Sequence, residues 1–164
     1  DGDRIILKED GSWSAAGNAP LTSKQQVRTT ELDVKLQKVI VESYKKKSQK
    51  NTKIKTQTVF YVQLDYSPQS DKNLIINDSD ITLIEVKDNN GKDYRVLSLN
   101  PAQAQIKPEE KITLVIRADK SPLLWDRVKS MTITFKVGII GLKSPISLSQ
   151  KTGDFDEENV SGFK

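Results

Sequence analysis

The sequence predicts an all-β protein, an antiparallel β-sandwich, from three observations. The segments Thr58–Leu64 and Ile112–Arg117 alternate their side chains with a period of two, which is typical of a strand with one buried face. Between two apolar runs, Asp88–Gly91 consists of residues that tolerate a positive φ, as a hairpin reversal requires. Apolar residues make up 35% of the chain and occur in short runs, which favours sheets buried on one face.

The first two strands of the sandwich are predicted at Glu31–Ser43 and Ile54–Tyr66. Alternation from Leu32 loses its register at Val39–Val41, as a β-bulge or a strand crossing would cause. A helix is the competing interpretation for the first segment, because several of its aliphatic residues also lie near helical spacing. The content of β-branched residues favours the strand. The second segment is expected to be a central strand.

The stretch Asp80–Ala118 organises the rest of the chain, and the other apolar segments are expected to pack against it. It follows a short edge segment, Asn73–Ile76, and contains a strand, a hairpin, a turn and a closing strand, predicted at Ile81–Val86, Asp88–Leu97, Lys107–Glu110 and Ile112–Arg117. Beyond it we expect one helical turn at Ser121–Asp126 that buries Trp125, a last clean strand at Met131–Val137, and short extra strands at 138–142 and 146–148.

Three regions follow from these elements. Residues 1–30 are predicted as an N-terminal β-hairpin and linker, residues 31–150 as the sandwich, and residues 151–164 as an acidic, flexible tail. In the first region, Asp10-Gly11 suits a type I′ turn that Trp13 lies across, and breakers such as Pro20 mark the linker.

The absence of certain residue types limits the chemistry of the chain. It contains no cysteine and no histidine, which excludes thiol nucleophiles, disulfides, imidazole-ligated zinc and Ser-His-Asp triads. No apolar run is long enough for a transmembrane helix. The chain starts at Asp1 without Met, so we expect a signal peptide removed before this residue and a periplasmic or secreted location; a shortened chain is the other explanation.

The main binding candidate is the segment Lys45–Lys55, with six lysines in eleven residues, within and beside a predicted basic loop at 44–53. The functional interpretation is an anionic partner such as a lipid surface or a glycan; the structural one is a solvated loop whose charge protects a strand edge. The formal net charge of +4 comes mainly from lysine, and the scarcity of arginine argues against nucleic acid. The candidate binding residues, including two tryptophans as stacking platforms, are Trp13, Tyr44, Lys45, Lys46, Lys47, Lys50, Lys53 and Trp125.

Acidic residues form two patterns that superficially resemble metal loops. Asp88, Asn90 and Asp93 surround Gly91, but the glycine falls too early for a calcium loop and no glutamate follows at the twelfth position. Acidic residues also alternate at 154–158. Turn chemistry explains the first set and a frayed tail the second, so no metal and no cofactor is predicted. Carboxylates alone can support hydrolysis, and a carboxylate-dependent hydrolase without assigned catalytic residues remains a further hypothesis.

Two motifs carry resemblances to exported bacterial proteins. The hairpin at Asp80–Val96, followed by the Pro108-Glu109-Glu110 turn, resembles immunoglobulin-like domains of unknown function in exported bacterial proteins and lipoproteins, over about residues 31–137. This chain has Glu109 where that family's Pro-Gly-Glu turn has glycine, and Ile81 where an aromatic residue is more usual. The opening Asp1–Trp13 resembles a D-G…D-G-S-W motif of mature proteobacterial exported proteins. Both resemblances imply export, and the first implies an immunoglobulin-like sandwich.

The sequence therefore predicts a non-enzymatic interaction or structural module of the bacterial cell envelope, whose partner is another envelope protein. The alternative is a binder of an anionic polymer or glycan, through Lys45–Lys55 and exposed tryptophan. Such domains bind through loops at one end of the sandwich or by accepting a strand at an open edge.

Overall fold

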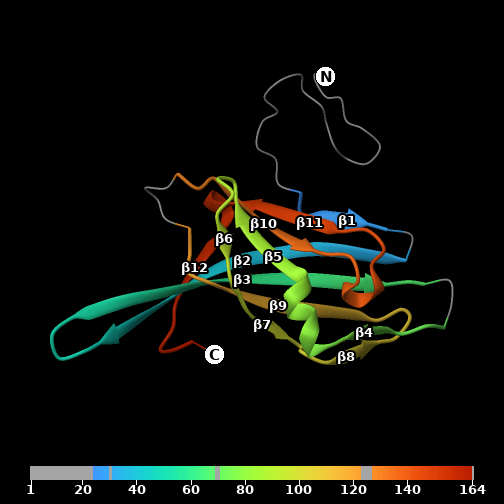
Figure 1. The fold of residues 1–164 in the computed structure, drawn as a ribbon, viewed down its shortest axis with the longest axis horizontal. Helices are drawn as coiled ribbons and strands as arrows, with labels where there is room; N and C mark the ends of the chain where they lie inside the picture. Colours follow the sequence, from blue (N-terminus) through green and yellow to red (C-terminus); the bar gives the residue numbers. More distant parts are fainter. Residues whose placement is uncertain (1–23, 30, 69–70, 123–126, 164) are drawn as a thin grey trace, which may run out of the picture.

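The fold is an all-β sandwich of two mainly antiparallel sheets, as the sequence predicts (Figure 1). The computed structural model describes residues 24–29, 31–68, 71–122 and 127–163. The N-terminal hairpin at residues 1–15 and Trp125 lie outside these residues. The immunoglobulin-like subtype and the division of the chain at residues 30 and 150 remain predictions.

The larger sheet is built around two long strands that form one hairpin. Its strand order is β1-β2-β3-β9-β7, and β12 adds to β2 in parallel. The bounds are Gln26–Arg28 for β1, Leu32–Lys47 for β2, Thr52–Tyr66 for β3, Lys111–Asp119 for β9, Val96–Asn100 for β7 and Asp156–Asn159 for β12. The predicted central strand at Ile54–Tyr66 is confirmed as β3, which lies between β2 and β9. The strand β2 does contain a bulge, but it lies between Leu36 and Lys38, before the predicted break at Val39–Val41.

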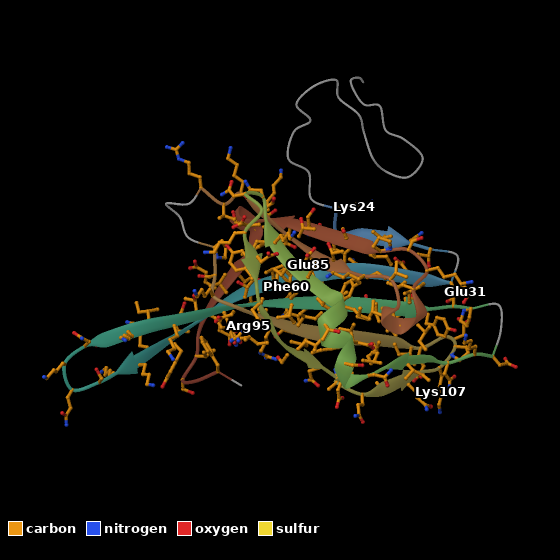
Figure 2. All side chains as sticks on the ribbon, in the orientation of Figure 1. Lys24, Glu31, Phe60, Glu85, Arg95 and Lys107 are labelled. Carbon is orange, nitrogen blue, oxygen red and sulfur yellow. The ribbon has the colours of Figure 1, made fainter. Side chains whose placement is uncertain are left out.

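The smaller sheet covers the other side of the core. Its order is β11-β10-β5-β6, and a separate two-stranded sheet pairs β4 with β8. The bounds are Ile146–Lys151 for β11, Ser130–Phe135 for β10, Ile84–Asp88 for β5, Asp93–Tyr94 for β6, Leu74–Ile76 for β4 and Ala104–Ile106 for β8. Fully buried side chains from both sheets meet between them, including Phe60, Leu114, Ile133 and Leu148, and Phe60 is labelled among them in Figure 2.

The hairpin reversal forms as predicted, and its return strand connects the two sheets. Gly91 has a φ of 85°, a left-handed conformation that costs glycine little. The buried Asp88 carboxylate accepts hydrogen bonds from the backbone N–H of Asn90 (2.8 Å) and Lys92 (3.1 Å) and from the Tyr94 hydroxyl (2.8 Å). The chain then leaves β6, which pairs with β5, and continues as β7, which pairs with β9. The predicted single return strand is thus two short strands, one in each sheet.

Further segments differ from the sequence prediction. Within the predicted linker, Gln26–Arg28 form strand β1, which pairs with β2 of the larger sheet. Residues Asp78–Leu83 form the 3-10 helix η1 instead of the start of a strand, because the Asp80 carboxylate accepts a hydrogen bond from the Asn77 N–H (2.9 Å) and holds a turn there. Residues Ile139–Gly141 form the 3-10 turn η3 instead of a short strand. The expectation of a frayed tail is wrong for strand β12, whose backbone gains hydrogen bonds by pairing with β2.

Tyr66, at the end of β3, couples the stability of the sandwich to alkaline pH. Its buried hydroxyl donates a hydrogen bond to the Lys72 carbonyl (2.5 Å), and burial, aided by the negative charge of Glu31, raises the pKa of Tyr66. Above the ordinary tyrosine pKa of about 10, the unfolded chain loses this proton while the folded protein keeps it. We therefore expect the free energy of unfolding to fall as pH rises above about 10, and to fall less steeply in Tyr66→Phe. Urea denaturation at several alkaline pH values measures this, and parallel slopes for the two proteins would contradict it.

Candidate functional site: a lysine-rich arm beside the C-terminal strand

Strands β2 and β3 continue beyond the sandwich as a two-stranded arm (Figure 1). On one side the ladder between β9 and β3 ends at Thr58, and one isolated bridge joins Gln57 to Lys120. On the other side β12 pairs with β2 only as far as Ser43. Residues 44–55, called the arm below, therefore lie outside the rest of the sheet. The prediction of a loop at 44–53 is wrong for most of these residues. Strands β2 and β3 stay paired as far as Lys47 and Thr52, and only residues 48–51 form the loop.

The lysines of the arm lie opposite each other and on both of its faces. Lys46 pairs across the strands with Lys53, Lys45 with Ile54, and Tyr44 with Lys55. Residues 45–55 are all exposed. Within the part of the chain that the structure describes, none of the six lysines between 45 and 55 forms an ion pair.

This arrangement has an electrostatic consequence. Like charges directly opposite each other destabilise a hairpin, so the Lys46–Lys53 pair weakens the arm. The repulsion is screened by salt and is relieved by any anion that binds between or beside the lysines. The arm therefore presents a positive surface that favours anionic groups.

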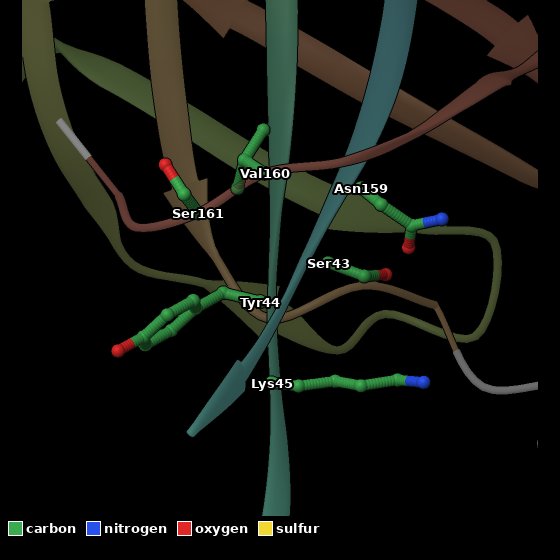
Figure 3. A pocket seen from close by; sticks show the side chains of 6 residues that line it. All are labelled: Ser43, Tyr44, Lys45, Asn159, Val160 and Ser161. Atoms are coloured by element: carbon green, nitrogen blue, oxygen red, sulfur yellow. The ribbon is translucent and has the colours of Figure 1, made fainter. Parts of the chain in front are cut away.

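The C-terminal segment packs against the base of the arm and forms a pocket with it. The N–H of Val160 donates to the Ser43 carbonyl (2.9 Å), and the rings of Tyr44 and Phe163 lie 5.8 Å apart at an angle of 59°. Figure 3 shows the resulting pocket, of about 320 Å³; its lining residues are Ser43, Tyr44, Lys45, Asn159, Val160 and Ser161. The pocket thus opens where the acidic strand β12 ends and the basic arm begins.

The structure brings together only some of the predicted binding residues. Tyr44 and Lys45 line the pocket, whereas Lys46, Lys47, Lys50 and Lys53 lie farther out on the arm. Trp13 and Trp125 lie outside the described residues. Sequence reasoning missed the C-terminal contributors, because it assigned residues 151–164 to a frayed tail. The signal that indicates them is the pair of apolar residues, Val160 and Phe163, after an acidic stretch.

The acidic patterns of the sequence have structural roles. Asp88 accepts three hydrogen bonds within its turn, as the turn interpretation predicts. Asp156 and Glu158 lie on strand β12, beside Ile40 and Glu42 of β2. Across the described residues, no cluster of three acidic side chains is placed to hold a metal ion.

Comparison with solved structures shows a likeness of fold. The structure is similar to the crystal structure of YcdA, a predicted lipoprotein of Bacillus subtilis subsp. subtilis strain 168, with a TM-score of 0.50 and 10% sequence identity. The match covers 81% of this chain but 40% of that chain, so this chain spans less than half the length of YcdA. No protein-family model matches the sequence, and no curated protein matches it. Among the described residues, no helix combines the length and apolar character that crossing a bilayer requires.

Proposed function

We propose that this protein is a non-enzymatic interaction module of the bacterial cell envelope, and that the arm is its binding element. The observation that carries the proposal is the arm itself: a paired hairpin that leaves the sandwich and bears six exposed lysines without an ion pair among the described residues. Cationic groups that repel each other in the free protein gain favourable interactions when an anionic partner binds.

Two further features support an envelope role. The fold is similar to that of YcdA, a predicted lipoprotein. The turn that resembles the exported immunoglobulin-like family places Glu109 at a φ of 69°, the left-handed conformation that glycine adopts most easily. Glycine is the residue of that family at this position of its turn.

Ile54 adds an apolar contact to the charged surface of the arm. Its side chain is 63% exposed, beside Lys53 and Lys55 and opposite Lys45. Protein interfaces surround apolar contacts with a polar, solvent-accessible rim, whereas a purely electrostatic contact with a polymer does not need apolar contacts. This exposed isoleucine favours a protein partner.

The second candidate function is the binding of an anionic polymer or glycan. The lysines favour it, because they lie on both faces of the arm and would neutralise a flexible polyanion without specific geometry. Binding of this kind weakens steeply as salt screens the charges, with a Debye length of about 8 Å at physiological ionic strength.

The test compares the whole protein with a variant whose arm is shortened. In this variant Asn-Gly replaces residues 45–54, so that Tyr44 and Lys55, which already pair, are joined by a two-residue turn. Each protein is immobilised and exposed to an extract of bacterial envelopes at low and at moderate salt, and bound material is identified by mass spectrometry. We expect the whole protein to retain one partner protein in stoichiometric amount at both salt levels. We expect the variant with the shortened arm not to retain this partner.

Two outcomes would change this conclusion. If both proteins retain the same partner equally, the arm is not the binding element. If only a polyanion is retained and moderate salt releases it, the second candidate function applies. A melting temperature close to that of the whole protein shows that the shortened variant is folded.

A further inference from the structure

The backbone hydrogen bonds at the base of the arm show which of its groups point outward. The Ser43 carbonyl accepts a hydrogen bond from Val160 (2.9 Å) and the Thr56 carbonyl accepts one from Lys120 (3.0 Å), so at both positions the backbone faces away from the β2–β3 ladder. At the tip, the N–H of Ser48 donates to the Asn51 carbonyl (2.9 Å) and closes the loop. Backbone groups alternate sides along a strand. The outward groups of the arm are therefore those of Lys45 and Lys47 on β2, and of Thr52 and Ile54 on β3.

The β2 edge is the continuation of an edge that the protein already uses. Strand β12 pairs with β2 at Ile40–Ser43, and its line of hydrogen bonds ends with Val160. The next outward groups on the same edge belong to Lys45, which lines the pocket, and to Lys47, which lies farther out on the arm. An added strand could thus extend the ladder and place a side chain in the pocket.

We propose that an extended acidic segment of a partner protein adds as a strand to the β2 edge at Tyr44–Lys47 and places one side chain in the pocket at the base of the arm. This inference rests on the proposed function and names the chemistry of the partner. Recognition of this kind combines a main-chain ladder, which supplies affinity, with pockets and charges, which supply specificity.

The lysines select the charge of the segment. Alternate side chains of an added strand point to opposite faces of the arm. One face carries Lys46, Lys53 and Lys55, and the other carries Lys45 and Lys47. An acidic side chain on either face meets lysines, whereas a basic segment is repelled on both faces.

A synthetic peptide tests the ladder separately from the charge. The probe is acetyl-Glu-Val-Glu-Val-Glu-Val-amide with a fluorescent label, and its binding to the whole protein is measured by anisotropy. Two control peptides carry N-methyl groups, one on the glutamates and one on the valines. In a strand only one of these two sets faces β2, so we expect one N-methylated peptide to bind about tenfold more weakly and the other to bind like the probe.

Two substitutions at one position provide the matched control in the protein. Lys45→Gln removes one charge and keeps the outward N–H. Lys45→Pro removes both the charge and the N–H. Proline is tolerated at this position because the N–H faces the outer side of an edge strand. We expect binding of the probe to weaken about threefold in Lys45→Gln and at least about tenfold in Lys45→Pro. Similar melting temperatures for the two variants show that the sandwich persists, and cross-strand NMR contacts between residues 46 and 53 show that the hairpin persists.

Three results would overturn the inference. Equal binding of all three peptides would mean that charge alone is recognised, although arm-dependent capture of an envelope partner would still support the proposed function. No binding of the probe at about 1 mM would exclude this edge as a strand acceptor. Self-association that is lost on changing Glu157 and Glu158 to Lys would identify the occupant as the acidic strand of a second copy.

Discussion

Changing Lys45, Lys46 and Lys47 to Glu is expected to weaken binding of the envelope partner by about 100-fold at low salt. Each exposed charge contributes up to about 1 kcal/mol to an interaction with an opposite charge, and reversal converts attraction into repulsion, so three changes give about 3 kcal/mol. The loss should shrink as salt increases. The fold should survive, because the three side chains are exposed and a glutamate in place of Lys46 would attract Lys53 across the hairpin. Titration of the purified partner at two salt concentrations measures the effect.

A second triple variant separates the position of the charges from their number. Lys107, Lys136 and Lys143 are also exposed but lie outside the arm. Each Lys→Glu change removes two units of positive charge, so both triple variants have a formal net charge of −2 instead of +4. We expect the second variant to bind nearly as well as the unchanged protein. Equal losses in both variants would show that the overall charge, and not the arm, governs binding.

Phe60→Ala is expected to destabilise the protein by about 4 kcal/mol, as large core truncations commonly do. Phe60 is 0% exposed and lies in β3 opposite Val39 of β2 and Ile116 of β9. Its removal leaves a cavity where the two long strands enter the core. With the free energy of unfolding of most domains at about 5–15 kcal/mol, this is a large fraction of the total. Urea denaturation measures the change as a shift of the midpoint.

The matched control is on the same strand. Ile54 is 63% exposed on the arm, so Ile54→Ala should change stability by less than about 0.5 kcal/mol while it weakens partner binding. A large loss of stability in Ile54→Ala would mean that the arm belongs to the folded core. A small loss in Phe60→Ala would mean that the core collapses around the cavity.

Local patterns in the sequence predicted most of the strands. The alternation in β3 and β9 depends only on each strand having one buried face, which produces a period of two. The reversal at Asp88–Gly91 was readable because its residues tolerate the backbone conformations of a turn. The prediction of a strand at the position of helix η1 was wrong, because it relied on the aliphatic residues of this segment. It did not take into account that the Asp80 side chain bonds to the backbone of Asn77 and holds a turn there.

Part of the candidate site was also predictable. The concentration of lysines at 45–55 identified the arm as the basic element, since charge is a property of the sequence alone. The partnership of Tyr44 with Phe163, and of Ser43 with Val160, was not readable. These residues are far apart in the chain, and no local pattern specifies which strand pairs with which edge.

The all-β class, the central strand β3, the main turn and the positive charge of the arm could all be read from the order of the residues. Three features emerge only when the chain is folded: it changes sheets after Tyr94, its C-terminal strand joins β2, and β2 and β3 continue as a pair beyond their neighbours. The difference arises because periodicity and turn chemistry are properties of adjacent residues. Strand pairing, in contrast, is settled by backbone groups that must find partners across the whole chain.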